Sequence, residues 1–582
     1  MSSIIKPEHR VRVVVATTVM LSFISFWRAA AIVLNDLASS AYYAGGIAER
    51  AAGKAAPWFI LAVMLFSYAV RAVYIESSAM FTRGGVYRVV KEALGGNLAK
   101  ISVSALMFDY ILTGPISGVS AGQYIVGLVA QTLTYFGHRW SPSGDETNHI
   151  SAVIAIAATL YYWWRNIKGV RESSTDALRI MKVTTVMVAL MILWCCYTLI
   201  ERGPRQYPAA PVAHNLQFDR TALGWLPDIT PSSFKEIPGT ASSQVSGNGE
   251  GSPRLGLVAS AGWVFGLIGI MIAFGHSVLA MSGEETLSQV NRELEHPKHK
   301  NLVRAGLVIF VYSLLFTSLV SFFASLLIPD SERPKYFDNL ISGLTMFVAG
   351  PLWARLLFQA FVVIVGFLIL SGAINAAIVG SNGVLNRVSE DGVMTDWFRA
   401  PHNKYGTTYR MINLIVALQL ITIIGSRGDV FALGEAYAFG VVWSFAFNGL
   451  ATLVLRYKDK SEREWKVPGN VRIAGREIPL GLVFVAGTLF AIALLNLFTK
   501  QIATISGLTF TLIFFVIFAI SEKVNLRKAS LAAASLDQFR LTYQQDIDPG
   551  VVRVRPGNVL VPVRDYHTLS HLGRVLDRTS TE

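Results

Sequence analysis

The amino-acid sequence predicts an all-α polytopic membrane protein with about twelve transmembrane helices. Of its 582 residues, 52% are hydrophobic and only 15% are charged, whereas about 25% of the residues in an average soluble domain are charged. The hydrophobic residues occur in blocks of about 20, the length at which a helix crosses roughly 30 Å of hydrocarbon. This composition excludes disorder for most of the chain and argues against a soluble multidomain enzyme.

The apolar blocks define a transmembrane domain over residues 28–521, preceded by an N-terminal cytoplasmic or interfacial segment over residues 1–27. The predicted spans are residues 28–50, 57–80, 99–133, 148–164, 175–200, 256–281, 302–328, 353–380, 409–427, 430–456, 479–499 and 503–521. Residues 13–27 are also apolar but are short for a span, so whether they extend the first helix stays open.

The charge of the short loops predicts how these helices are oriented. With the N-terminus inside, most Lys and Arg of the short loops fall on the inner side, as in the loops that contain Arg165, Lys298 and Arg399. Because cytoplasmic loops are enriched in these residues, we expect a multi-pass protein of the cell membrane (inner or plasma membrane) with both termini in the cytoplasm. The net charge of +13 is explained in this way, without nucleic acid as a partner.

Three segments lie outside the predicted spans. Residues 201–255 are rich in Pro, Gly and Ser, so we expect a flexible outer loop without a core of its own. Residues 329–352 are predicted to form a short, partly apolar helix at the outer surface. Residues 522–582 form a cytoplasmic tail in which residues 558–563 (NVLVPV) indicate one strand, followed by one helix. This piece is too small to bury a core alone.

Polar stripes inside the apolar blocks are the main functional candidates, because an ionisable group in a span is costly unless it faces a cavity or a partner. The first stripe consists of Asp36, Ser39, Ser40 and Tyr43. Their spacing of i, i+3, i+4 and i+7 puts them on one helix face. Gly45 and Gly46 follow directly and are predicted to break the helix. Such a break at membrane depth is tolerated where it lines a cavity.

The second stripe lies in the third span, where Asp109, Thr113 and Ser117 stand four residues apart. Pro115 cannot donate a backbone hydrogen bond and interrupts the helix ladder near this stripe. Oxygen ligands around two carboxylates suit a hard monovalent cation or a proton relay better than a soft metal. The serines and threonines could instead only pack helices together.

Other ionisable residues in the spans are weaker signals. His276 could relay protons or could be a hydrogen-bonded structural histidine. Arg71 and Glu76 are close in the second span and could simply pair. Tyr437 is most simply an aromatic packing residue. The sequence contains no His/Cys set with metal spacing, no nucleophile–base pair and no phosphate-binding loop, so we expect neither an enzyme nor a bound cofactor.

Several motifs occur in the order typical of the amino acid–polyamine–organocation (APC) superfamily, which the sequence resembles over about residues 28–456. They are Gly84-Gly85-Val86-Tyr87, Asn166-Ile167-Lys168-Gly169, Gly283-Glu284-Glu285 and Pro297-Lys298-His299-Lys300-Asn301. The resemblance implies a five-plus-five inverted repeat, the LeuT/APC-like fold, with discontinuous first and sixth helices. Gly283 would belong to the second of these helix breaks.

Within this superfamily, both stripes resemble the potassium–proton symporters of the KUP type, in particular the KimA branch. The first-helix pattern D-x-x-S-S-x-x-Y is matched by Asp36, Ser39, Ser40 and Tyr43. The third-helix pattern D-Y-I-L-T-x-x-x-S is matched by Asp109, Tyr110, Ile111, Leu112, Thr113 and Ser117. The resemblance implies that the acidic, tyrosyl and hydroxyl positions surround K⁺, together with Tyr437 on the tenth helix. It also implies a homodimer, because NVLVPV resembles the start of the universal-stress-like domain that forms the dimer contact in that branch.

The sequence departs from that branch in two places. Leu279 replaces a hydroxyl residue on the sixth helix, although Ser277 and Ser282 are near. The tail contains only one strand and one helix of that domain, so nucleotide regulation is not carried over from the resemblance; either the chain ends early or this piece docks on a partner.

The leading hypothesis is therefore a secondary transporter that takes up K⁺ together with H⁺ by alternating access. Asp36 would supply charge to the cation, and neutral oxygens would come from Tyr43, Thr113 and Tyr437. The candidates for exchanging the coupling proton are Asp109, His276 and Glu285. Two alternatives stay open: a proton-coupled amino acid permease of the same fold, and a membrane sensor that binds without transporting.

Overall fold

The computed structural model describes residues 24–80, 85–138, 140–169, 174–237, 254–258, 262–459, 463–473 and 476–535. Residues Ile24–Arg527 form one compact unit, to which the following description applies. The strand and helix predicted near residues 558–582 lie outside the described residues, as does most of the segment 1–27.

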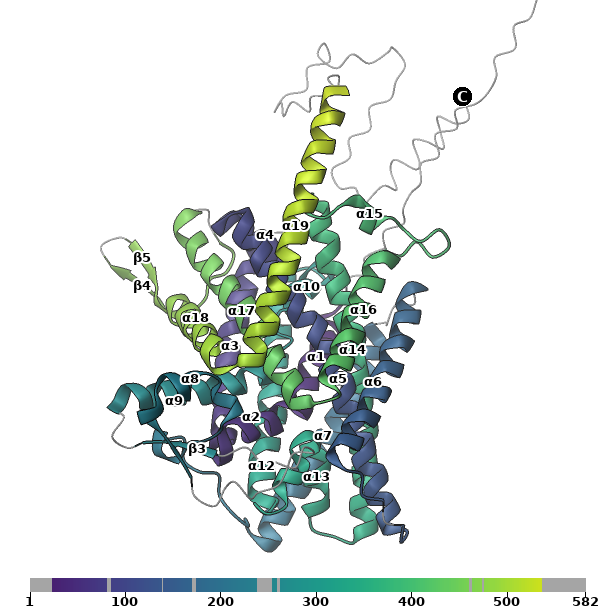
Figure 1. The fold of residues 1–582 in the computed structure, drawn as a ribbon, viewed down its shortest axis with the longest axis vertical. Coiled ribbons are helices and arrows are strands. Elements are labelled where there is room, and N and C mark those ends of the chain that lie inside the picture. The colour runs from purple at the N-terminus through teal and green to yellow at the C-terminus, as the bar shows by residue number, and fades with distance from the viewer. Residues whose placement is uncertain are drawn as a thin grey trace, which may run out of the picture. The chain divides into compact units, whose positions relative to one another are not determined.

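The unit is a bundle of helices that run in alternating directions (Figure 1). Its first half contains α1 (Phe26–Leu37), η1 (Ala38–Tyr42), α2 (Ala44–Ala52), η2 (Gly53–Ala55), α3 (Ala56–Met80), α4 (Gly85–Leu94), α5 (Gly96–Tyr135), α6 (Gly144–Ile167) and α7 (Ser174–Arg202). Its second half contains α9 (Gly262–Ser277), η7 (Val278–Met281), α10 (Thr286–Val290), η8 (Asn291–Glu293), α11 (Lys298–Ser313), η9 (Leu314–Ser318), α12 (Leu319–Leu327), η10 (Arg333–Asn339), α13 (Leu340–Phe347), α14 (Leu352–Glu390), α15 (Asp396–Arg399), α16 (Tyr409–Ser426) and α17 (Val430–Lys458). Two further long helices follow, α18 (Leu480–Thr499) and α19 (Gln501–Ser535).

The predicted spans correspond to these helices. Among the described residues, nine helical segments are long and apolar enough to cross a membrane, and one of them, Phe26–Met80, contains the first two predicted spans. The long helices α5 and α6 account for the third and fourth spans. The short outer helix predicted within 329–352 is present as η10 and α13. The all-α polytopic architecture is therefore confirmed.

The first and sixth predicted helices are both interrupted, as the inverted-repeat fold requires. In the first, the 3-10 segment η1 separates α1 from α2. In the sixth, η7 and a turn at residues 282–285 separate α9 from α10. The long helix α5 packs against α14, α17 and α6 and so lies at the centre of the bundle (Figure 1).

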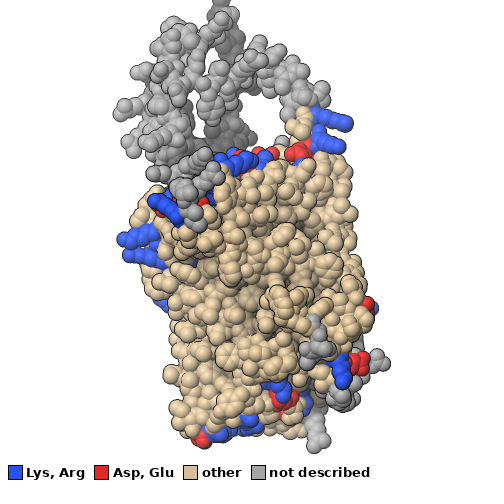
Figure 2. Space-filling view, turned by 90° about the vertical axis from the view of Figure 1, so that its left-hand side faces the viewer, with Lys and Arg blue, Asp and Glu red and all other residues tan. Residues whose placement is uncertain are grey.

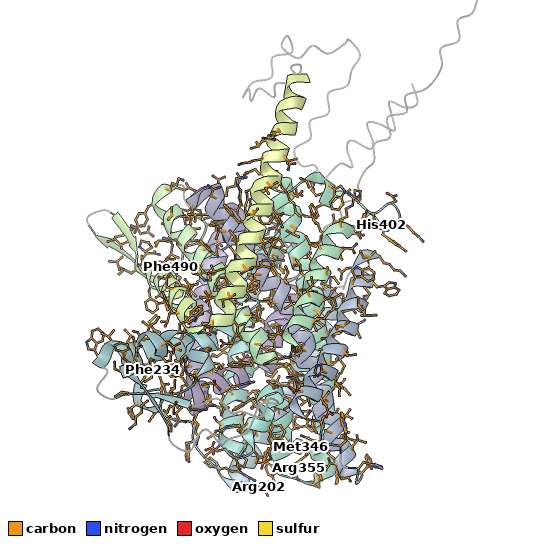
Figure 3. All side chains as sticks on the ribbon, viewed as in Figure 1. Arg202, Phe234, Met346, Arg355, His402 and Phe490 are labelled. Atoms are coloured by element: carbon orange, nitrogen blue, oxygen red, sulfur yellow. The ribbon has the colours of Figure 1, made fainter. Side chains whose placement is uncertain are left out.

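The surface is divided into an apolar band and two charged rims. On the face in Figure 2, Lys, Arg, Asp and Glu gather toward the two ends and leave a wide uncharged band between them. In Figure 3, His402 lies at one end, and Arg202, Met346 and Arg355 lie at the other. These ends match the predicted sides, because His402 belongs to a predicted inner loop, Arg202 and Met346 belong to predicted outer segments, and Arg355 lies at the predicted outer end of the span 353–380. We refer to them as the predicted cytoplasmic and outer ends.

The outer segment after α7 has more structure than the sequence suggests. It contains η3 (Ala213–Asn215), β1 (Gln217–Asp219), η4 (Thr221–Leu223), α8 (Leu226–Ile229), η5 (Pro231–Ser233), β2 (Phe234–Glu236) and β3 (Arg254–Leu257). The strands form an antiparallel sheet in the order β1-β3-β2. Phe218, Leu223 and Leu255 share an apolar core with Phe59 and Ile272 of the bundle. The expectation of a flexible loop is thus wrong for these residues, because the bundle supplies the core that the segment lacks. At the other end, β4 (Asn470–Ile473) and β5 (Arg476–Pro479) form a hairpin.

Candidate functional site

The two helix breaks touch each other through Gly283. This glycine has a φ of +97°, and a Cβ added there would lie 3.0 Å from the Leu37 backbone nitrogen and 3.3 Å from Cγ of Asp36. A side chain at this position would be strained by its conformation and crowded by α1. Ser40 adds a second link between the breaks, because its hydroxyl donates to the Ala280 carbonyl at 2.8 Å. Gly283 lies in the turn that follows η7, at the second helix break.

Asp36 lies at the end of α1, where the first break begins, and is only 3% exposed. Its Oδ2 accepts a hydrogen bond of 2.7 Å from the hydroxyl of Thr286, the first residue of α10. Its Oδ1 has no hydrogen-bond partner within the described part of the chain. The Asp36 carboxylate therefore joins both interrupted helices and keeps one oxygen available for a ligand.

Asp109 of α5 is fully buried and faces α17. Gly440 permits the contact, since a Cβ there would lie 2.7 Å from the Asp109 backbone nitrogen. Neither carboxylate oxygen of Asp109 has a partner of normal hydrogen-bond geometry among the described residues, although the Tyr437 phenol lies beside it. One turn along α5, the Thr113 hydroxyl lies 2.9 Å from the Tyr437 hydroxyl, which also hydrogen bonds to Ser282.

A third carboxylate, that of Glu285, faces the same region from the turn after the second break. It is 2% exposed and lies within electrostatic range of Asp36 and Asp109. Glu285, Tyr110 and Gln289 line a cavity of about 20 Å³, which holds about one water molecule. The Gln289 amide donates to the Tyr110 hydroxyl across this cavity.

These residues form one buried polar cluster between the first, third, sixth and tenth helices, to which we refer as the chamber. Its predicted members are Asp36, Tyr43, Asp109, Tyr110, Thr113, Tyr437 and Glu285. The Tyr43 hydroxyl lies beside Ser39 and Ser282. Ser117 is fully buried one turn beyond Thr113, and its hydroxyl makes no hydrogen bond within the described residues.

Gly45 and Gly46 do not form the break, so this prediction is wrong. The break is η1, and both glycines lie in the first turn of α2. Their role is close packing: a Cβ on Gly46 would lie 1.7 Å from the Phe337 carbonyl oxygen of η10. Tyr124 strengthens this closure, because its hydroxyl donates to the Tyr42 carbonyl at 2.8 Å and accepts from the Ile341 amide at 3.2 Å. The chamber is therefore closed toward the predicted outer end.

Beyond this closure, toward the predicted outer end, lies a cavity of about 1170 Å³. Its lining includes Gln123, Phe337, Asp338 and Asp429. Burial is the largest effect on Asp338 and raises the pKa of its carboxyl above the ordinary value, while Arg50 acts in the opposite direction. The η10 segment thus separates this outer cavity from the chamber.

His276 belongs to a second cluster rather than to the chamber. Its Nδ1 lies 3.0 Å from Glu435, and Lys500 lies 3.8 Å from the same carboxylate. Its Nε2 lies 2.8 Å from the Ala222 carbonyl of the outer segment. His276 therefore has structural partners, and its imidazole does not contact Asp36 or Asp109. Its predicted role in proton coupling has no support from these contacts.

Sequence reasoning missed two residues that hold the chamber together, Thr286 and Gln289, which bind Asp36 and Tyr110. Ser282, which the sequence suggests only as a hydroxyl near Leu279, hydrogen bonds to Tyr437. All three follow η7 closely, so the Gly283 motif marked the right region. In addition, Arg71 pairs with Glu284 and not with Glu76. Glu76 instead accepts from Arg456 and Arg463.

The chamber offers carboxylate, phenol and hydroxyl oxygens and no sulfur or imidazole. Within the described residues, no group of three or more His, Cys, Asp and Glu side chains has the arrangement of a metal site. The fold and its two helix breaks together define a multi-pass membrane protein of the transporter class.

Comparison with known proteins gives the family. A family model described as amino acid permease matches residues 24–519, so the chain belongs to the amino acid permease family, within the APC superfamily. A search of curated proteins finds no match. Among solved structures, a manganese transporter from Eremococcus coleocola has a TM-score of 0.43 at 10% identity, covering 88% of this chain and 95% of that chain. Two mutants of that transporter have TM-scores of 0.45, at 9% and 10% identity, with the same coverage.

Proposed function

We propose that this secondary transporter of the cell membrane takes up K⁺ together with H⁺ by alternating access and has both of its termini in the cytoplasm. One observation carries the proposal. Asp36, Asp109 and Glu285 are all buried in one chamber, and each has at least one oxygen without a hydrogen-bond partner in the described part of the chain. An ionised carboxylate buried without a partner costs several kcal/mol. The chamber therefore needs positive charge from a cation, a proton or both.

The other oxygens favour a large monovalent cation over a divalent metal. Tyr43, Thr113, Ser282 and Tyr437 present uncharged hydroxyl groups between Asp36 and Asp109. Neutral oxygens that replace a hydration shell are typical of K⁺ sites, whereas Mg²⁺ demands a small octahedral shell. In the proposed site, Asp36 provides the charge and the hydroxyl groups provide most of the ligands.

The coupling proton would be exchanged by Asp109, with Glu285 as the second candidate. Asp109 has two oxygens without a well-formed hydrogen bond and lies near two other carboxylates. Three neighbouring carboxylates and one monovalent cation leave excess negative charge, which a proton on one of them removes. Proton binding would therefore favour the loaded chamber and link the two fluxes.

The second candidate function is proton-coupled transport of an amino acid, which the description of the family model favours. The chamber is less suited to this cargo. An amino acid carboxylate would be repelled by Asp36, and the space at Gly45 and Gly46 is filled by Leu340 and Phe337. A cationic amine is the only part of such a substrate that the three carboxylates would attract.

The test is ⁸⁶Rb⁺ uptake against labelled amino acids in proteoliposomes that carry a proton gradient. We expect Rb⁺ uptake that is lost in Asp36→Asn and Asp109→Asn. Ser120→Ala is the matched control, because Ser120 is buried on α5 beyond Ser117 and its hydroxyl has no partner among the described residues. Rb⁺ uptake that persists unchanged in Asp36→Asn, or amino acid uptake without Rb⁺ uptake, would contradict the proposal. Binding of Rb⁺ without any flux would favour a sensor.

A further inference from the structure

One face of α17 carries polar side chains from the chamber toward the predicted cytoplasmic end. Tyr437, Ser444 and Asn448 are at most 1% exposed. Their spacing of seven and eleven residues puts them on the same helix face and places Ser444 and Asn448 about 10 and 16 Å from Tyr437 along the axis. The direction is clear because Asp429, at the start of α17, lines the outer cavity.

Asn448 is the unusual member of this face. Neither its amide nitrogen nor its amide oxygen has a hydrogen-bond partner in the described part of the chain. A buried amide in this state costs about 1–3 kcal/mol, and native proteins commonly satisfy such groups with ordered water. Helix packing alone does not explain an asparagine here, because an apolar side chain of similar size would pack without this cost.

Tyr74 of α3 connects this face to the carboxylates. Its ring makes an edge-to-face contact with Phe445, with centroids 5.8 Å apart, and its hydroxyl lies beside Ser444. The same phenol lies within electrostatic range of Glu285 and Asp109. Tyr74 is 1% exposed. The Ser444 hydroxyl donates to the Val441 carbonyl at 3.1 Å, and the Tyr74 hydroxyl has no hydrogen-bond partner among the described residues. These two hydroxyl groups extend the polar side chains of the chamber into the interface between α3 and α17.

The same two helices are fastened at the predicted cytoplasmic end. Glu76 of α3 is fully buried and accepts 2.7 Å hydrogen bonds from Arg456 of α17 and from the Val467 amide. Arg463 also pairs with Glu76. This network joins α3 to α17 at the predicted cytoplasmic end. A cation needs an open path with oxygen ligands, whereas a proton needs only a chain of hydrogen bonds.

We propose that the α3–α17 seam, formed by Tyr74, Ser444 and Asn448, conducts the coupling proton from the chamber to the predicted cytoplasmic end. The cation would leave by a different route, past Tyr110 and Gln289. In this route each hydroxyl accepts one proton and gives up its own, a water bound to the Asn448 amide would carry the proton onward, and the chamber carboxyl is left as a carboxylate. This inference rests on the proposed coupling of cation and proton transport.

The experiment separates proton transfer from cation movement. Proteoliposomes are assayed for Rb⁺-driven proton flux with an internal pH dye and for ⁸⁶Rb⁺/Rb⁺ exchange, which requires no proton release. For Asn448→Leu and Tyr74→Phe we expect proton flux at least tenfold below that of the unmodified protein, with exchange within twofold of it. The proton flux of Asn448→Ser, whose hydroxyl can still bind water, should lie between that of Asn448→Leu and that of the unmodified protein. Gln289→Leu is the control for the cation route, and it should change the rate of ⁸⁶Rb⁺/Rb⁺ exchange.

Folding is checked by thermal stability, which should not fall in Asn448→Leu because the change removes an unpartnered amide. Unchanged proton flux in both Asn448→Leu and Tyr74→Phe would overturn the proposal that the seam conducts the proton. A parallel loss of Rb⁺ exchange and proton flux in Asn448→Leu and Asn448→Ser would overturn it as well. Failure of the unmodified protein to move Rb⁺ is a separate result. It would overturn the proposed function and not the seam alone.

Discussion

Gly46 gives the sharpest prediction about how the transporter closes. In Gly46→Ala, the new Cβ would lie 1.7 Å from the Phe337 carbonyl oxygen. Real Cβ atoms essentially never approach other heavy atoms within 3.0 Å, so η10 must withdraw from α2 by more than 1 Å. The neighbouring atom is backbone and cannot rotate away. We therefore expect Gly46→Ala to open the outer closure above the chamber.

The size of the effect follows from the cost of overpacking. An extra methyl in a close-packed contact costs about 1–3 kcal/mol, which shifts a two-state equilibrium about 5–150-fold toward the state without the contact. Gly45→Ala is the matched control one residue earlier. Its Cβ would lie 3.1 Å from Cδ2 of Leu340, the end of a flexible side chain, so a small adjustment suffices.

The assay is the reaction of Ala41→Cys, in the first helix break, with a membrane-impermeant thiol reagent added from outside. The background chain has Cys195 and Cys196 replaced by serine. We expect Gly46→Ala to raise the labelling rate at least fivefold and to slow turnover, while Gly45→Ala stays within twofold of the unmodified background. Equal labelling rates in both variants, or no increase in Gly46→Ala, would refute the idea that this contact closes the outer side.

Three further predictions concern the chamber. Thr286→Val removes the hydrogen bond to Asp36 and should raise the half-saturating Rb⁺ concentration about tenfold, because hydrogen bonds to charged groups contribute about 1.5–3 kcal/mol. Tyr437→Phe breaks the link between the third, sixth and tenth helices and should likewise weaken Rb⁺ binding, measured as lost thermal stabilisation by Rb⁺. Glu284→Gln should lower stability by about 3–5 kcal/mol, because its buried arginine partner loses its counter-charge. The neighbouring change Glu285→Gln should alter transport and its pH dependence with little effect on stability.

The sequence predicts the helices well because each span leaves a local signature. Apolar blocks of sufficient length and the charge of short loops are properties of consecutive residues, so the predicted spans and the observed helices agree closely. The stripes of Asp36 and Asp109 are equally local, since helical spacing alone places their members on one face. Their meeting in space comes from the fold.

Contacts between distant segments could not be predicted in the same way. Arg71 and Glu76 suggest a pair because they lie near each other on one helix, yet each binds a partner more than 200 residues away. Gly45 and Gly46 suggest a helix break because glycine weakens helices, but their missing side chains make room for η10 and α13. The outer segment looked flexible because half of its core belongs to α2, η2, α3 and α9. In each case the deciding neighbour is remote in sequence.

The turn after the second break shows how a charge in the chamber can move a helix. Three consecutive residues, from the end of this turn to the start of α10, have different partners: Glu284 pairs with Arg71 of α3, Glu285 faces the chamber, and Thr286 donates to the Asp36 carboxylate of α1. Arg71 also donates to the Gly306 carbonyl of α11, so Glu284 is anchored to the surrounding bundle. A cation or proton that binds near Asp36 and Glu285 changes the charge on α1 and on the turn directly beside Glu284, which is itself held in place. Because a ligand shifts conformation only through contacts that differ between two states, we expect this turn to be the place where occupancy of the proposed site is converted into movement of the sixth helix relative to the first.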